Sequence, residues 1–110
     1  LVVSDERLKT DVHTMTGSLD KILQLRPTEF TWIENGKSDT GFIAQEVERI
    51  IPDVVYETKG FTDISSDEQN DEIYKTISYN KLTTYLVDTI QQLTKRVEDL
   101  EKQNTRVEVD

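Results

Sequence analysis

Residues 79–107 read YNKLTTYLVDTIQQLTKRVEDLEKQNTRV, and they carry the most regular pattern in the chain. Mostly apolar residues recur there at alternating spacings of four and three: Tyr79, Thr83, Leu86, Ile90, Leu93, Val97, Leu100, Asn104 and Val107. Such a heptad repeat is typical of helices that wrap around one another. The sequence therefore predicts a helix from about Asn80 to Asn104 whose seam packs against copies of itself, chiefly through Leu86, Ile90, Leu93, Val97 and Leu100.

Charges beside this seam predict how the helices are oriented. With Ile90 and Val97 at position a, Arg96 falls at g and Glu101 at the following e, the pairing expected between parallel neighbours. β-branched residues at a with leucine at d favour two strands in the simple rules. An ordinary amphipathic helix on its own globular core is the alternative. We expect a parallel homo-oligomer, because regular heptads of this length are uncommon in short domains.

The beginning of the chain predicts short helices. Apolar residues have the spacing of one face of a helical turn at Leu8, Val12 and Met15. After Gly17, Ser18 can cap a helix over 19–25, which Pro27 ends. A second short helix is predicted over 44–51, ended by Pro52.

Strands are predicted between and after these helices. Phe30 and Trp32 alternate with polar residues, and Asn35-Gly36 suits a tight hairpin turn with a return strand toward Phe42. Residues 54–56 also favour a strand. We therefore expect an α+β fold, mainly helical, with a small globular head followed by the long helix.

Residues 57–72 contain six acidic residues and little to bury, so we expect an exposed loop. The spacing of Asp63, Ser65 and Asp67 imitates the first ligands of a calcium loop. Glu68, however, stands where the tight turn of such a loop requires glycine, so a solvated loop is favoured.

Composition narrows the classes of function. The 22 acidic residues exceed the 13 basic ones, and a formal charge of -9 repels a phosphate backbone, so we expect no nucleic-acid partner. The chain has no cysteine, no phosphate-cradling glycine loop and no ligand cluster, and we expect no metal or cofactor. No apolar run is long enough for a membrane span.

Three blocks of the sequence together resemble a known family. They are Ser4-Asp5-Glu6-Arg7-Leu8-Lys9, then Gly41-Phe42-Ile43-Ala44-Gln45-Glu46-Val47-Glu48 with Pro52 and Val55, then Tyr79 and Leu82 entering the coiled coil. With the stretch from Leu25-Arg26-Pro27 to Trp32, they resemble the C-terminal intramolecular chaperone domain of phage endosialidases, tailspikes and tail fibres, a family of self-cleaving serine peptidases. The resemblance runs from Ser4 to about Leu100.

This resemblance implies a trimer that follows a β-rich fibre or spike domain of the same polypeptide, helps three chains to fold in register, and is then cut away. It divides the chain into the edge of the upstream client or a boundary remnant (1–3), a head (4–78) and a coiled-coil helix (79–107). We prefer the trimer to two strands, because a short seam with mixed a and d residues discriminates weakly. We expect it to act during virion assembly in the host cytoplasm and to be released from the mature tail fibre.

Residue by residue, the resemblance implies that Ser4 is a nucleophile and Lys9 its base. A serine hydroxyl needs a base, and a lysine serves only when neutral, a form that desolvation or a nearby cation favours; Arg7, Lys21 or Arg26 could supply that cation. On a regular helix a spacing of five separates two side chains by about 140°. We therefore expect Ser4 before the helix or in a strained turn, or Lys9 reaching a neighbouring subunit's Ser4.

The expected reaction is single-turnover cleavage of the Val3–Ser4 bond, with cleavage on the other side of Ser4 left open. Asp5, Arg7 and Gln45 are supporting candidates: Asp5 suits a helix N-terminus, Arg7 an ion pair, and Gln45 a backbone contact or a carbonyl. His13 is more simply explained as a structural residue.

Two other functions compete with this one. The first is a permanent trimerisation or adhesion module that never cuts, against which the intact Ser4 and Lys9 argue. The second is the similar self-cleaving domain of the membrane-tethered myelin regulatory transcription factors. We favour the phage chaperone over the transcription factor, because the coiled coil ends in polar residues, as expected of a detachable tail.

Overall fold

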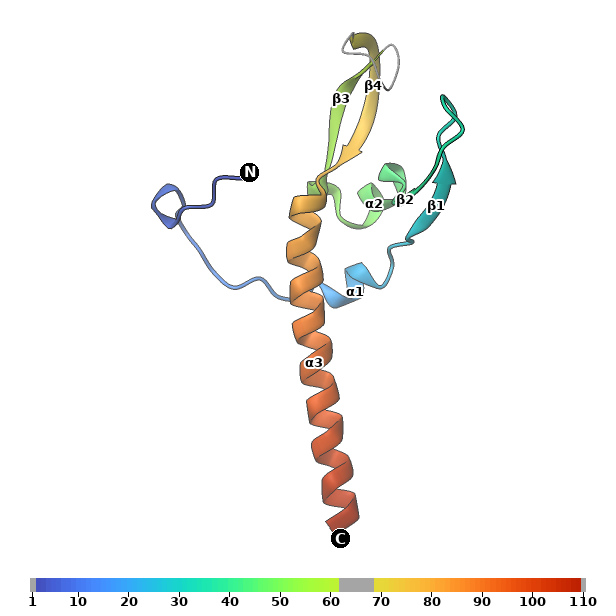
Figure 1. Cartoon of the computed structure of the whole chain (residues 1–110). Coiled ribbons are helices and arrows are strands. Elements are labelled where there is room, and N and C mark those ends of the chain that lie inside the picture. Colours follow the sequence, from blue (N-terminus) through green and yellow to red (C-terminus); the bar gives the residue numbers. More distant parts are fainter. Residues whose placement is uncertain (1, 62–68, 110) are drawn as a thin grey trace.

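The long helix α3 (Tyr79–Val109) dominates the computed structural model, which describes residues 2–61 and 69–109. It extends well beyond the head, and the molecule is 69 Å long (Figure 1). Its seam side chains are 40–62% exposed in the single chain: Leu86, Ile90, Leu93, Val97 and Leu100. The predicted α+β class and the long C-terminal helix are confirmed, and the trimeric coiled coil stays a prediction.

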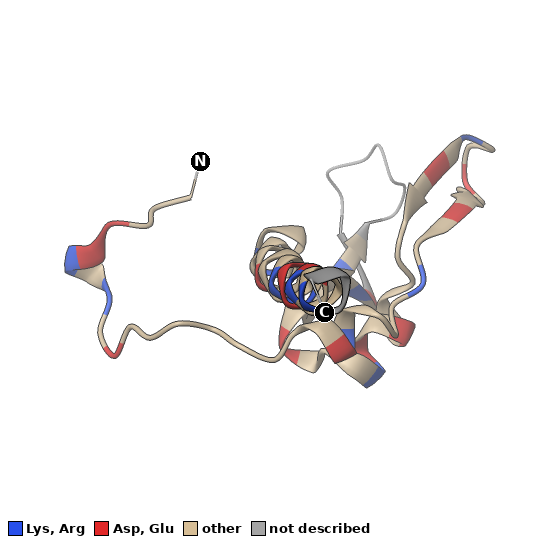
Figure 2. Cartoon of the chain, turned by 90° about the horizontal axis from the view of Figure 1, so that it is seen from below, with Lys and Arg blue, Asp and Glu red and all other residues tan. Residues whose placement is uncertain are grey.

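Residues 2–17 form an extended arm, which leaves the body on the side of α3 away from the rest of the predicted head (Figures 1 and 2). From here on, the head means that rest, without the arm. Its one helical element is the single 3₁₀ turn η1 (Glu6–Leu8). The helical turn expected through Leu8, Val12 and Met15 is therefore wrong. Asp11 (φ 53°) interrupts it, and Leu8 and Val12 are 74% and 78% exposed. Without a surface to pack on, so short a helix is not stabilised.

A short helix and a hairpin follow the arm. Helix α1 (Leu19–Ile22) is shorter than the predicted 19–25, and strands β1 (Thr28–Thr31) and β2 (Ser38–Gly41) pair antiparallel. The rings of Phe30 and Trp32 meet edge to face, with centroids 4.9 Å apart, which confirms that they share a side. The Trp32 N–H donates to the Lys37 carbonyl at 2.9 Å, so residues 33–36 form the loop of the hairpin. This loop is wider than the tight turn that Asn35-Gly36 suggests.

Helix α2 (Ala44–Ile50) forms as predicted and ends before Pro52, which opens the 3₁₀ turn η2 (Pro52–Val54). Strands β3 (Val55–Phe61) and β4 (Gln69–Ile77) then pair in an antiparallel ribbon. The prediction of an exposed loop over 57–72 is therefore wrong for residues 57–61 and 69–72, which lie in these strands. The calcium-like spacing at 63–68 lies outside the described residues.

The hydrophobic core joins α2 and η2 to the beginning of α3. It consists of four buried side chains, Val47, Ile51, Val54 and Leu82. Together with residues 18 and 19, which bond to Asp88 and Gln92, this core covers the N-terminal part of the long helix, and the C-terminal part extends beyond the head (Figure 1). Across the described ranges, no helix has the length and apolar character needed to cross a membrane.

Candidate functional site

The structure brings Ser4 and Lys9 together on the arm. The Lys9 Nζ donates a hydrogen bond of 2.7 Å to the Ser4 Oγ. Ser4 precedes η1, and Lys9 follows it with an extended backbone (φ -120°, ψ 152°), so the two side chains flank a single turn. This is the nucleophile-to-base separation that acyl transfer requires, and it lies within one chain.

Asp5 and Arg7 occupy the turn between these two residues. The Arg7 guanidinium donates to both oxygens of the Asp5 carboxylate, from Nε at 3.0 Å and from Nη2 at 2.9 Å. These hydrogen bonds lower the pKa of Asp5 and raise that of Arg7. In this chain the Arg7 guanidinium therefore binds Asp5.

The Ser4 and Lys9 side chains lie in water in the single chain. Both residues are exposed, and so are the apolar residues that flank them, Val3 (77%) and Leu8. Figure 2 shows the arm reaching away from α3 and the head. The hydrogen bond is therefore formed, but this chain does not supply the dry surroundings that favour a neutral lysine.

The other sequence candidates lie on the head. Gln45 is exposed in the first turn of α2, which lies across α3 from the arm (Figure 1), so the single chain does not bring it to Ser4. Arg26 donates to both carboxylate oxygens of Glu46, the α2 residue next to Gln45, at 3.0 and 2.6 Å. That ion pair raises the pKa of Arg26 and lowers that of Glu46.

Helix α3 holds the base of the arm through two side chains that the sequence analysis missed. The Ser18 N–H donates to Asp88 Oδ2 at 2.9 Å, and the Leu19 N–H donates to Gln92 Oε1 at 3.1 Å. The predicted side-chain cap from Ser18 is wrong, because its buried Oγ has no hydrogen-bond partner among the described residues. The sequence signal for these two acceptors was that Asp88 and Gln92 lie one helical turn apart, beside the apolar seam.

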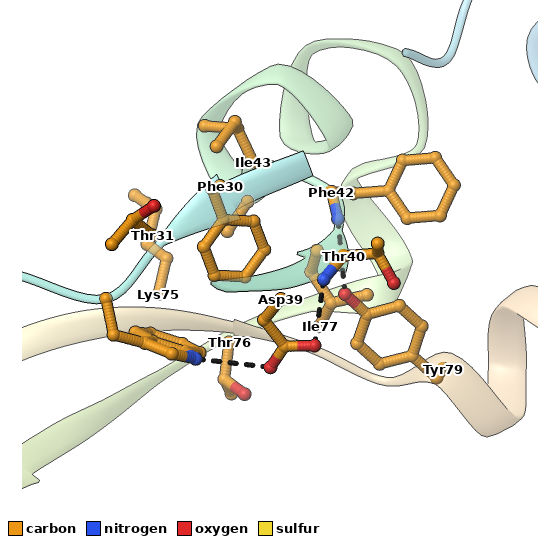
Figure 3. Close-up of a pocket in the computed structure, with 12 residues that line it drawn as sticks. Phe30, Thr31, Asp39, Thr40, Phe42, Ile43, Lys75, Thr76, Ile77 and Tyr79 are labelled. Atoms are coloured by element: carbon orange, nitrogen blue, oxygen red, sulfur yellow. Dashed lines mark hydrogen bonds between the residues drawn. The ribbon is translucent and has the colours of Figure 1, made fainter. Parts of the chain in front are cut away.

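A separate cavity of about 590 Å³ lies between the β1–β2 hairpin, β4 and the start of α3 (Figure 3). Aromatic and aliphatic side chains line it, among them Phe30, Trp32, Phe42, Ile77 and Tyr79. Its charged groups are engaged: Asp39 accepts from the Thr40 N–H and the Trp32 indole, which lowers its pKa, and Lys75 pairs with Glu48. The cavity offers an apolar surface rather than an acid, base or nucleophile.

Within residues 2–61 and 69–109, no group of acidic, histidine or cysteine side chains is placed to hold a metal ion.

Comparison with known proteins points to one family. The family model described as chaperone of endosialidase matches residues 4–56. The match begins at Ser4, includes the arm, the hairpin and α2, and ends at the start of β3. No curated protein matches the chain.

Proposed function

We propose that the chain, which the family model described as chaperone of endosialidase matches over residues 4–56, is an intramolecular chaperone that cuts itself free. Three copies assemble through α3 and help to fold a β-rich fibre or spike domain that precedes them in the same polypeptide. They act during virion assembly in the host cytoplasm. The observation that carries the cleavage step is the 2.7 Å hydrogen bond between Lys9 and Ser4.

Cleavage proceeds through an ester in this proposal. The Ser4 Oγ attacks the carbonyl carbon of Val3 while neutral Lys9 takes the hydroxyl proton. The Val3–Ser4 carbon–nitrogen bond then breaks, and the proton passes from Lys9 to the Ser4 nitrogen, which leaves as an amine. Water hydrolyses the ester, placing its hydroxyl on the Val3 carboxyl and a proton on the Ser4 Oγ. The products are a chain ending at Val3 and a chain beginning at Ser4.

Assembly supplies the surroundings that a single chain lacks. Lys9 is exposed to water in the single chain, whereas a lysine acts as a base in dry surroundings. Apolar side chains next to the dyad, Val2, Val3 and Leu8, are also exposed, as is the seam of α3. Packing of the arm against a neighbouring copy covers these apolar groups and removes Lys9 from water in one step. Cleavage therefore follows assembly.

One observation favours a second function, a permanent oligomerisation module that never cuts. If the arm stays in solvent, as in the single chain, Lys9 lacks the dry surroundings in which a lysine acts as a base. In that case the Ser4–Lys9 contact is a surface hydrogen bond, and α3 alone carries the function.

Intact mass under denaturing conditions separates the two functions. The chain is produced behind the polypeptide that naturally precedes it, as wild type, Ser4→Ala and Lys9→Ala. Thr10→Ala, on the same arm, and Lys37→Ala, another exposed lysine, serve as matched controls. We expect wild type and both controls to be cut between Val3 and Ser4, and Ser4→Ala to stay whole. Lys9→Ala should be slower by roughly 100-fold or more, the contribution typical of a positioned base.

Two outcomes contradict the proposal. An uncut wild type that is nevertheless a stable oligomer supports the permanent module. Cleavage of Lys9→Ala at the wild-type rate removes Lys9 from the mechanism. The masses of the fragments also distinguish a cut before Ser4 from a cut after it.

A further inference from the structure

The contact between Ser4 and Lys9 spans a single 3₁₀ turn. Their spacing of five residues places two side chains about 140° apart on a regular α-helix, where they do not meet. Here the intervening residues form the 3₁₀ turn η1, closed by the Leu8 N–H on the Asp5 carbonyl and by the Lys9 N–H on the Glu6 carbonyl, both at 3.1 Å. Whatever holds this turn also holds the Lys9 ammonium at the Ser4 hydroxyl.

The Asp5 carboxylate is the side chain that closes the turn. Its Oδ1 accepts the Arg7 backbone N–H at 2.9 Å, the capping hydrogen bond of η1. The same oxygen accepts Arg7 Nε, and Oδ2 accepts Arg7 Nη2. One carboxylate thus binds the backbone and the guanidinium of a single residue, in the two-pronged geometry that orders an arginine side chain.

This pair does little for overall stability, because the Asp5 and Arg7 side chains are 41% and 85% exposed. Asp5 is also a poor proton acceptor, since both of its oxygens already receive hydrogen bonds from Arg7. What remains for the pair is geometry: it sits between the two reacting side chains and restricts the backbone that joins them.

We propose that Asp5 and Arg7 are positioning residues, which hold the turn that keeps the Lys9 Nζ on the Ser4 Oγ. This inference rests on the proposed function, because the value of that geometry lies in the cleavage step. Loss of the pair leaves Ser4 and Lys9 in place chemically, but lowers the fraction of chains in which they meet. A misplacement of about 1 Å can slow a reaction by roughly 100-fold.

Cleavage rates of matched variants test the proposal, again with the preceding polypeptide attached. Asp5→Ala removes the cap, whereas Asp5→Asn keeps an oxygen that accepts the Arg7 N–H. We expect Asp5→Ala to cut roughly 10- to 100-fold more slowly than wild type, and Asp5→Asn to recover most of that loss. Arg7→Ala should be slowed as well, and the double variant no further than Asp5→Ala. Glu6→Ala, on the same turn, is the control and should cut at the wild-type rate.

A second measurement on the same samples does not depend on cleavage. Nuclear Overhauser contacts between the Lys9 ε-methylene and the Ser4 β-methylene report whether the two side chains meet. They should be present in wild type and Asp5→Asn and lost in Asp5→Ala, while the size of the assembly stays unchanged.

Several results overturn the proposal: wild-type cleavage by Asp5→Ala, equal slowing by Asp5→Asn and Asp5→Ala, or Overhauser contacts that persist in Asp5→Ala. An uncut wild type is a failure of the proposed function instead. In that event the Overhauser contacts alone decide whether Asp5 positions Lys9.

Discussion

Single side-chain contacts fasten the head to the long helix. The Tyr85 hydroxyl of α3 donates to Asp53 Oδ2 of η2 at 2.6 Å. The Asp53 carboxylate, with burial as the smaller cause, raises the pKa of Tyr85 to about 12, and the same hydrogen bond lowers the pKa of Asp53. One turn earlier, the Lys81 ammonium lies 5.4 Å from the centre of the Tyr56 ring. Each contact joins α3 to the segment that contains η2 and β3.

Tyr85→Phe should change how stability depends on pH. The folded protein holds the Tyr85 proton more tightly than the unfolded chain, whose tyrosines titrate near 10. The stabilisation is therefore fully present below pH 10 and is lost as the pH rises toward 12. At pH 7 we expect the variant to be less stable by about 1–2 kcal/mol. Urea unfolding at several pH values checks this.

The comparison of wild type with Tyr85→Phe isolates this residue from the other groups that titrate at alkaline pH. The gap in the free energy of unfolding between the two proteins should narrow between pH 10 and 12. Asp53→Asn, which removes the partner carboxylate, should also weaken the alkaline dependence. A gap that stays constant over this range contradicts the assignment.

At the scale of elements, α3 does more than present a seam. Asp88 and Gln92 accept the backbone N–H groups of Ser18 and Leu19, and so satisfy donors at the start of α1 that have no partner inside so short a helix. Asp88 and Ser18 are both buried, so water cannot replace the acceptor. The helix expected to assemble the copies also sets the point from which the arm departs.

Asp88→Ala should destabilise the fold, because it leaves the buried Ser18 N–H without an acceptor. The expected loss is about 1–3 kcal/mol in the free energy of unfolding. Asp88→Asn keeps an acceptor oxygen and should recover most of it, and Gln91→Ala, at an exposed neighbouring position, should have little effect. Denaturant titration measures all three. Equal stability of Asp88→Ala and Gln91→Ala would show that the hydrogen bond does not matter.

For the whole molecule, the main feature is that much apolar surface lies outside the core. The seam of α3 and the apolar residues of the arm are exposed on an elongated chain, and the head leaves the C-terminal part of the helix uncovered (Figure 1). Contiguous apolar surface of this kind marks an interaction site in soluble proteins. The seam and the arm are therefore the surfaces on which assembly and cleavage are expected to be coupled.

Val97→Asp should abolish both assembly and cleavage. An unpaired carboxylate in the packed seam costs about 3 kcal/mol or more, which weakens association by more than roughly 100-fold. Lys95→Asp places the same side chain on the outward face and should leave both intact. Light scattering reports the assembly, and intact mass reports the cut. A monomeric Val97→Asp that still cleaves normally refutes the coupling.

Local sequence pattern was sufficient to predict the elements whose backbone hydrogen bonds form within the element itself. The heptad spacing predicted α3, the alternation of Phe30 and Trp32 predicted the hairpin, and Pro52 marked the end of α2, because helices and hairpins form their hydrogen bonds between neighbours in sequence. Ser4 and Lys9 came as a candidate pair from a resemblance, and their role as a dyad stays a prediction.

Tertiary structure decided what depends on distant partners. No local rule joins Ser18 to Asp88, 70 residues away, and such an acceptor replaced the cap predicted within the segment. The acidic segment 57–72 begins and ends in strands because β3 and β4 pair with each other, although the segment itself has few apolar residues to signal a strand. The arm is extended for the opposite reason: its apolar spacing suits a helix, but this chain offers it no surface to pack on.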